Sequence, residues 1–266
     1  MNRMPTRVAK EDEVQLREIA IGGLVPHIGA MITRPAHEKA RGIKHCCQLA
    51  GWRRMSVERK YDGEYCQVHI DLGKSRDCIK IFSKSGKDSS NDRIGLHGSL
   101  RSSLKLGTAD CKIKRQCILE GELLVWNDRD EQIEPFYKIR TYVQRSGRSL
   151  GCGRDSPVSP DEHLMIMFYD LLLLDDTVCI REPHDKRRQQ LQSLVHHTPG
   201  RVDIGSREVI DFSSSSTTEL LYQAFTQAIA RRWEGFVLKG CADPYFSFNG
   251  ADSFISSHDS VGAPTG

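Results

Sequence analysis

The sequence predicts a mixed α+β fold in which antiparallel sheets are flanked by helices. Short runs alternate apolar and polar residues, as half-buried strands require. Other segments repeat apolar residues at helical spacing, which predicts peripheral helices. A turn signal separates two neighbouring strands, and such a signal favours a hairpin and antiparallel pairing. Together these patterns are typical of one core built from sheets with helices packed outside.

The first predicted element is a helix over residues 35–49, after a stretch (1–33) that gives no clear element. Pro35 suits the first position of a helix. An apolar stripe repeats at helical spacing through Ala36, Ala40, Ile43 and Cys47. Gly51 ends the helix.

Four strands come next. Residues 66–70 alternate apolar and polar side chains, and residues 79–83 alternate again. The turn Gly73-Lys74-Ser75 lies between them, so the pair is predicted to form a hairpin. Residues 117–126 and 164–174 are more strongly apolar strands.

A flexible loop is expected at 145–160 from its Gly, Ser and Pro content. Two amphipathic helices are predicted at 185–195 and 217–232. The second helix has apolar residues four positions apart: Leu221, Phe225 and Ile229. Thr217 or Thr218 can cap it.

The end of the chain changes in composition. Residues 236–238 are predicted as a last buried strand. No lysine or arginine follows Lys239, and the final stretch is mostly Gly, Ser, Ala, Asp and Pro. Such a stretch buries too little surface to offset its ordering entropy. We therefore expect a domain over residues 1–246 and a disordered tail over 247–266.

Composition excludes several classes of protein. With 38 Lys+Arg against 35 Asp+Glu the net charge is +3, which excludes a strongly basic DNA-coating protein but allows a locally basic groove. The apolar run 164–174 contains Asp170 and is shorter than the about 20 residues of a membrane span. The first residues have no apolar secretory region, and the nine cysteines are scattered without a CxxC pair. The protein is therefore expected to be intracellular, not secreted and without a membrane partner.

The segment Glu58-Arg-Lys-Tyr-Asp-Gly-Glu64 precedes the first strand and contains a candidate nucleophile. A lysine at the mouth of a sheet becomes nucleophilic when its pKa falls from about 10.4, through desolvation, a second cation or a metal. That lysine is Lys60, and Gly63 would let the backbone turn closely beside a ligand. Taken alone, the segment is also typical of a charged turn.

Carboxylates interrupt otherwise apolar strands. Glu120 and Glu122 lie within CILEGELLVW, where a buried carboxylate needs a partner such as a metal or a sugar hydroxyl. Glu234 and Lys239 begin and end EGFVLK, a pairing that suits a metal-bridged phosphate. Tyr169, within MIMFYDLLLL, is either a core aromatic or a platform for a purine. Each glutamate alone is more typical of a solvated strand end.

The order of these segments resembles the ATP-dependent DNA ligases. ERKYDGE, IFSKSG, ILEGELLVW, MFYDLLLLDD and EGFVLK match the nucleotidyltransferase domain of that family around its motifs I, III, IIIa and IV. KxDG alone is a weak signal, but four co-linear motifs are a strong one. The resemblance covers about residues 25–246, and REPHDKRRQQLQSLV is similar to the family's helix between motifs IIIa and IV. It implies an ATP-grasp-like nucleotidyltransferase fold.

The resemblance also implies ATP and Mg²⁺ as cofactors and nicked double-stranded DNA as the partner. Lys60 would attack the α-phosphate of ATP and form a lysine–AMP adduct, and the AMP would pass to the 5′-phosphate of a nick before sealing. Glu122 and Glu234 would bind the metal. The implied nucleotide-binding residues are Glu58, Tyr61, Asp62, Gly63, Lys84, Glu122, Tyr169 and Lys239. A monomer in the nucleus is the family-level expectation.

The sequence departs from the family pattern at several points. Position 65 is Tyr where KxDGxR has Arg, so a bidentate donor is lost, and Lys84 keeps the charge of the usual Ser-Arg without its fork. The lysine-bearing strand of motif V and an OB-fold domain are expected to be missing, because no lysine follows Lys239. Two alternatives therefore stay open: an RNA ligase or mRNA capping enzyme, and an inactive nucleotide- or DNA-binding remnant.

Overall fold

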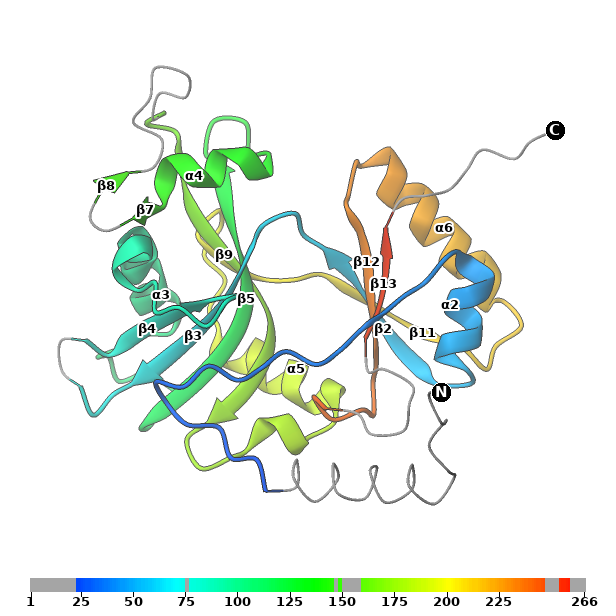
Figure 1. Cartoon of the computed structure of the whole chain (residues 1–266), viewed down its shortest axis with the longest axis horizontal. Helices are drawn as coiled ribbons and strands as arrows, with labels where there is room; N and C mark the ends of the chain where they lie inside the picture. The colour runs from blue at the N-terminus through cyan, green and yellow to red at the C-terminus, as the bar shows by residue number, and fades with distance from the viewer. Residues whose placement is uncertain (1–22, 75–76, 146–147, 150–158, 247–253, 259–266) are drawn as a thin grey trace, which may run out of the picture.

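Two β-sheets form the body of the protein, with helices on their outer sides (Figure 1). The computed structural model describes residues 23–74, 77–145, 148–149, 159–246 and 254–258. The six-stranded sheet lies on the left in Figure 1, and the five-stranded sheet lies on the right. Both sheets are mainly antiparallel, so the predicted α+β class is confirmed.

The six-stranded sheet contains the two strands predicted from alternation and the two predicted from apolar runs. Its main path has the order β10-β9-β5-β3-β4, and β6 pairs with β5. The bounds are β3 Glu64–Asp71, β4 Ile79–Ser83, β5 Gln116–Asn127, β6 Gln132–Ile133, β9 Glu162–Leu174 and β10 Val202–Ile204. Strands β3 and β4 form the predicted hairpin, and the Lys74 N–H donates to the Asp71 carbonyl at 3.1 Å in its turn. Ser75 lies outside the described residues.

The five-stranded sheet has the order β1-β13-β12-β2-β11. Its strands are β1 Glu38–Lys39, β2 Arg54–Lys60, β11 Arg207–Asp211, β12 Gly235–Gly240 and β13 Phe254–His258. The predicted strand 236–238 is confirmed as β12, but it is not the last strand, because β13 pairs with it antiparallel. Residues 254–258 lie inside the predicted tail, so the expectation of disorder is wrong for them. The domain boundary at 246 stays a prediction.

Helix α2 (Ile43–Ala50) begins later than the sequence predicted. Residues 35–42 are not helical; they contain β1, which pairs with β13, and Gly42 has φ 157°. The predicted end is confirmed, because the Gly51 N–H donates to the Cys47 carbonyl and Gly51 has φ 61°. Gly51 is thus in the left-handed region, where glycine is favoured.

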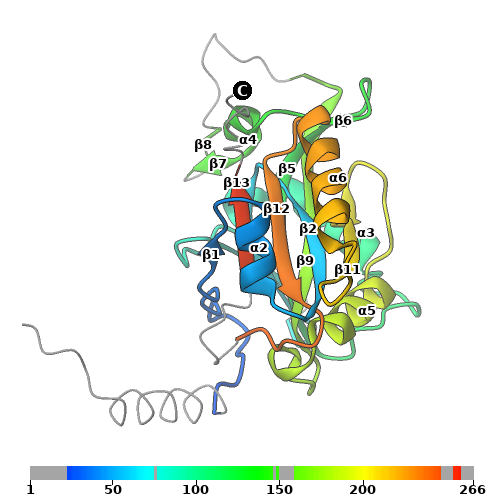
Figure 2. The ribbon, with the colours of Figure 1, turned by 90° about the vertical axis from the view of Figure 1, so that its right-hand side faces the viewer.

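Helix α6 (Thr217–Ala230) lies beside α2 on the outer face of the five-stranded sheet, as Figure 2 shows. A hydrophobic cluster joins both helices to β2 and β12; it includes Cys46, Ala50, Met55, Val57, Leu221, Phe236 and Leu238. The predicted threonine cap is wrong: the N-cap is Ser216 without a side-chain cap, and the Thr217 hydroxyl donates to the Asp211 and Ser214 carbonyls.

The remaining helices cover the six-stranded sheet. These are α3 (His97–Ser103), α4 (Ile139–Tyr142) and α5 (His184–Leu194), with short 3-10 turns at Asn91–Leu96, Phe136–Lys138 and Cys179–Arg181. Helix α5 confirms the predicted helix 185–195 and packs against β9. In the predicted loop 145–160, Gln144–Arg145 and Arg148–Ser149 pair as β7 and β8, and residues 146–147 and 150–158 lie outside the described residues. No helix in the described part of the chain is long and apolar enough to span a membrane.

Three side chains of β3 hold the segment 29–34 along the sheet. Gln67 makes reciprocal hydrogen bonds with Ile32, accepting from its N–H at 2.9 Å and donating to its carbonyl at 3.1 Å. Nδ1 of His69 accepts from the Gly29 N–H at 3.2 Å. Tyr65 lies under the guanidinium of Arg34. Side chains two residues apart share one face of a strand, so the three anchors form a row.

His69 is buried and uncharged in this row. Because Nδ1 accepts a hydrogen bond, the proton sits on Nε2, which lies 2.9 Å from Gln67 Oε1. Burial, followed by the charge of Lys80, lowers the pKa of His69 to about 4. Protonation would remove the acceptor that holds Gly29.

We expect His69 to make stability depend on pH. The folded pKa lies below the unfolded value of about 6.5, so its contribution is present above pH 6.5 and is lost as the pH falls toward 4. The predicted loss is up to about 3 kcal/mol of unfolding free energy. Urea unfolding at a series of pH values should show this loss in the wild type and a shallower slope in His69→Gln.

The exposed His27→Gln is the matched control and should keep the wild-type slope, since His27 lies at the surface of the same N-terminal region. Equal slopes for His69→Gln and the wild type between pH 6.5 and 4 would contradict the assignment of a neutral, anchoring His69.

Candidate active site

All ten residues that the sequence predicted for catalysis, nucleotide binding or metal binding line one cavity of about 540 Å³. Strand β2 supplies Glu58 and Lys60, and the turn after it supplies Tyr61, Asp62 and Gly63. The other lining residues of this set are Lys84 after β4, Glu122 on β5, Tyr169 on β9, Glu234 before β12 and Lys239 on β12. Both sheets therefore contribute to the cavity. The individual roles of these residues stay predictions.

A tight turn carries the chain from one sheet to the other at Lys60. Strand β2 ends at Lys60 and β3 begins at Glu64. A Cβ on Gly63 would lie 2.4 Å from the Leu123 carbonyl oxygen and 2.7 Å from Cγ of Glu122. Only glycine fits without movement, so Gly63 lets the turn pack directly on β5. In the structure Gly63 therefore approaches β5 closely, whereas the sequence predicted a close approach to a ligand.

Lys60 forms an ion pair with Glu234. The pairing follows from the sheet register, because Lys60 at the end of β2 lies opposite Gly235 at the start of β12. Both side chains are about a quarter exposed, at 27% and 25%. Desolvation, followed by the charge of Glu234, raises the pKa of nearby Asp62. Lys60 is therefore within reach of solvent and held by a carboxylate.

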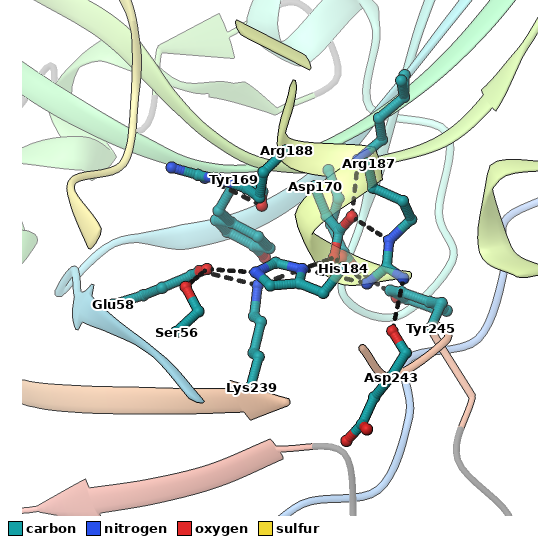
Figure 3. Close-up of polar contacts among 12 residues, drawn as sticks. Ser56, Glu58, Tyr169, Asp170, His184, Arg187, Arg188, Lys239, Asp243 and Tyr245 are labelled. Carbon is teal, nitrogen blue, oxygen red and sulfur yellow. Dashed lines mark hydrogen bonds and ion pairs between the residues drawn. The ribbon is translucent and has the colours of Figure 1, made fainter. Parts of the chain in front are cut away.

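Glu58 lies at the other end of the cavity and is held by three donors (Figure 3). Ser56 Oγ and His184 Nε2 lie 2.9 Å and 2.7 Å from its Oε1, and Lys239 Nζ lies 2.9 Å from its Oε2. Burial alone would raise the pKa of Glu58, but Lys239 and His184 outweigh it and hold the pKa well below its usual range. Glu58 is thus an ionised, buried carboxylate.

A second buried carboxylate, Asp170 on β9, faces the same group of residues. Arg187 of α5 donates to both of its oxygens, from Nε at 2.7 Å and from NH2 at 3.0 Å. Burial would raise the pKa of Asp170, but Arg187 and Lys239 lower it to about 2. Lys239 Nζ lies 3.8 Å from Asp170, so one ammonium is shared between the carboxylates of the two sheets.

His184 joins the two carboxylates as a neutral ring. Arg187 NH2 donates to Nδ1 at 3.3 Å, which leaves the ring proton on Nε2 for Glu58. Burial lowers the pKa of His184, against the charge of Glu58. The hydrogen bonds therefore assign the tautomer without a charge on the ring.

Tyr169 is half-buried in the cavity wall, next to these charges. The ammonium of Lys239 lies 4.9 Å from the centre of its ring. Arg188 NH1 donates to the Tyr169 carbonyl at 3.2 Å, and Arg188 NH2 donates to the Gly205 carbonyl. These hydrogen bonds from α5 fix the backbone that carries the ring, so the ring can serve as a flat platform.

The carboxylates Glu120 and Glu122 have different surroundings. Glu120 Oε1 accepts hydrogen bonds from the hydroxyls of Tyr65 at 2.7 Å and Tyr245 at 2.8 Å. Desolvation raises the pKa of Glu122 to about 8, and the charges of Arg34 and Lys60 oppose that rise. Glu120 is therefore a satisfied, buried acceptor, whereas Glu122 packs beside Gly63 in the turn after Lys60.

Glu122 and Glu234 fit a hard divalent cation. Both carboxylates line the cavity, where Glu234 pairs with Lys60 and Glu122 packs beside the turn after Lys60. The described residues contain no cluster of three or more metal-binding side chains. Mg²⁺ does not need one, because it binds through one or two carboxylates and completes its shell with water and phosphate oxygens.

Sequence reasoning missed several residues of the site. They are Arg34, His37, Lys39, Tyr65 and Tyr245 in the lining, and His184 and Arg187 behind it. A signal for the last two exists, because the buried face of α5 includes His184, Arg187, Arg188, Leu191 and Leu194. Polar residues in phase with buried leucines indicate a buried polar contact.

Comparison with known proteins identifies the family. Residues 36–249 match the family model described as "ATP dependent DNA ligase domain". The chain is 27% identical over 199 residues to DNA ligase 4 of Dictyostelium discoideum, covering 75% of this chain and 17% of the relative. It is 26% identical over 220 residues to a DNA ligase of Aeropyrum pernix, covering 83% of this chain and 32% of the relative.

Solved structures show the same fold. A mycobacterial DNA ligase D complexed with ATP and MES has a TM-score of 0.55 at 18% identity, covering 88% of this chain and 62% of that chain. The ATP-dependent DNA ligase from bacteriophage T7 complexed with ATP has a TM-score of 0.52 at 16% identity, covering 85% and 68%.

The chain spans only 17% to 20% of the first DNA ligase 4 relatives that it matches, so the comparisons describe one domain. Within this chain, however, the family match extends over most of the residues and includes the six-stranded sheet, the five-stranded sheet apart from β13, and every predicted site residue. The chain therefore belongs to the family of the ATP-dependent DNA ligase domain.

Proposed function

We propose that this chain is the adenylation domain of an ATP-dependent DNA ligase, which acts on nicked double-stranded DNA with Mg²⁺ as a cofactor. The observation that carries the proposal is Lys60, held by Glu234 in a cavity that also contains an ionised Glu58 and an aromatic Tyr169. A monomer in the nucleus is part of the proposal and rests on the family resemblance.

In the proposed first step, Nζ of Lys60 attacks the α-phosphorus of ATP. The new nitrogen–phosphorus bond replaces the bond from that phosphorus to the β-phosphate oxygen, and pyrophosphate leaves. The AMP then moves from Lys60 to the 5′-phosphate of the nick, and the 3′-hydroxyl displaces AMP to form the phosphodiester. The protein's contribution is in-line positioning and charge stabilisation.

Lys60 must be neutral when it attacks, because an ammonium has no lone pair. In the structure its Nζ forms an ion pair with Glu234. Glu234 is therefore the carboxylate in contact that can receive the proton. When bound at Glu122 and Glu234, Mg²⁺ would offset phosphate charge.

The opposite end of the cavity suits an adenine. Glu58 is an acceptor that cannot donate, because its pKa is held low, and an exocyclic amino group is a matching donor. Tyr169 provides an aromatic face beside it. The distance between Glu58 and Lys60 along β2 is two residues, so base and phosphate subsites lie on one face of one strand.

We expect α-labelled ATP and Mg²⁺ to label the protein covalently at Lys60. The adduct should be stable at neutral and alkaline pH. Labelling should fall by at least about 10³-fold in Lys60→Ala, because the nucleophile is removed. Gel labelling followed by peptide mapping measures both the yield and the position. Lys80→Ala is the matched control, since Lys80 lies on β4 and pairs with Asp88; it should label like the wild type.

An adduct of equal yield in Lys60→Ala, or one that maps to another lysine, would contradict the proposed nucleophile. Preference for GTP over ATP in the same assay would favour the capping-enzyme alternative.

We also expect the labelled protein to transfer AMP to a 5′-phosphate at a nick in duplex DNA. Transfer to a nick in duplex RNA should be slower by at least about tenfold, a discrimination of about 1.4 kcal/mol. Denaturing gels that follow an end-labelled strand measure adenylation and sealing separately. Transfer to RNA alone would support the RNA ligase alternative, and nick binding without an adduct would support the inactive remnant.

A further inference from the structure

Arg34 lies at the rim of the cavity, over the ring of Tyr65. Its guanidinium carbon is 4.9 Å from the centre of that ring, and both residues line the cavity. Tyr65 is 5% exposed, and its hydroxyl is turned inward to Glu120. The ring is therefore a fixed, flat support, and a guanidinium stacks well on such a face.

The position of Arg34 is fixed from several residues away. Ile32 is buried and joined to Gln67 by two hydrogen bonds, and the Gly29 N–H binds His69. These anchors leave only one residue between Ile32 and Arg34. The backbone next to Arg34 is thus held in place, which reduces the entropy lost when the arginine binds a ligand.

Arg34 acts at the Lys60 end of the cavity. Tyr65, over which it stacks, is the register partner of Glu122 in the β3–β5 pair. The Glu122 side chain packs against Gly63 in the turn after Lys60. Glu58 is instead surrounded by Lys239 and His184 at the other end. An anion that reaches Lys60 would therefore approach Arg34 as well.

The chemistry of Arg34 suits a phosphate. The side chain is exposed and lines the cavity, so it does not fill a core and is within reach of a ligand there. A guanidinium offers a planar pair of donors that matches two phosphate oxygens. Tyr65 itself offers no charge at this position and has its hydroxyl engaged with Glu120.

We propose that Arg34, stacked on Tyr65, binds the phosphate of the nucleotide that reacts with Lys60. The inference rests on the proposed function and adds a binding residue to it from a part of the chain far from Lys60 in sequence. Arg34 supplies the planar pair of donors, and the ring of Tyr65 orients it. Gln67 and His69 hold the segment 29–34 in place.

The test compares the affinities of AMP and adenosine, which differ only in the phosphate. The protein is first treated with pyrophosphate to discharge any adenylate, and binding is measured by calorimetry in Mg²⁺. Arg34→Gln should weaken AMP binding by about 10- to 100-fold and leave adenosine binding within about twofold. The AMP affinity of Arg34→Lys should lie between those of the wild type and Arg34→Gln, because lysine keeps the charge without the planar pair of donors. Arg41→Gln, an exposed arginine outside the lining, is the control and should behave as the wild type.

The outcomes separate this inference from the proposed function. Unchanged AMP affinity in Arg34→Gln overturns the inference, even when the wild type forms an adduct at Lys60. Equal weakening of AMP and adenosine also overturns it, because a merely structural role would act on both. Phosphate-dependent weakening without any adduct in the wild type supports the inference and contradicts the proposed chemistry. A wild type that binds neither ligand overturns both.

Discussion

Two buried carboxylates determine how the sheets can meet. Glu58 belongs to the five-stranded sheet and Asp170 to the six-stranded sheet, and both are almost completely buried. A buried charge without a partner costs several kcal/mol, so the sheets can approach only with the counter-charges in place. Lys239 and Arg187 supply the counter-charges, and the neutral ring of His184 adds a hydrogen bond to Glu58. The same contacts leave Glu58 ionised, oriented and in the lining of the cavity, so one electrostatic constraint serves both folding and the site.

The opposite end of the cavity depends on close packing. Gly63 allows the turn after Lys60 to touch β5 beside Glu122, and the β2–β12 register brings Glu234 to Lys60. The two ends therefore differ in chemistry: paired, deeply buried charges lie at the Glu58 end, while the Lys60 end keeps a partly exposed cation and carboxylate. Under the proposed function, a bound nucleotide with a metal would exchange partners with the second set without breaking the first. The fold would then stay intact while the reacting groups change their contacts.

Much of this arrangement could be predicted from the sequence, and the failures have physical reasons. Strands β3 and β4 were predicted from their alternation, and β5 and β9 from their apolar runs, because β5 and β9 are buried on both faces. Strand β2 was not predicted, because only Met55 and Val57 alternate with polar neighbours there, and the charged residues around them leave too short an apolar pattern to identify a strand. The start of α2 was placed too early, since a local stripe cannot show that β1 pairs with β13. The site lysine and carboxylates followed from co-linear motifs. His184 and Arg34 did not, because their contacts span 126 and 31 residues and exist only in the folded chain.

The central claim is that the side chains shared by Glu58 and Asp170 couple the two sheets. A double-mutant cycle on unfolding free energy, with Glu58→Gln, His184→Phe and the double variant, measures that coupling most directly. The account predicts an interaction energy of about 1–3 kcal/mol, because Glu58→Gln removes the charge of the acceptor and His184→Phe removes the donor of the same buried hydrogen bond. Effects that add within about 0.3 kcal/mol would show that Glu58 and His184 act independently, and would contradict the account.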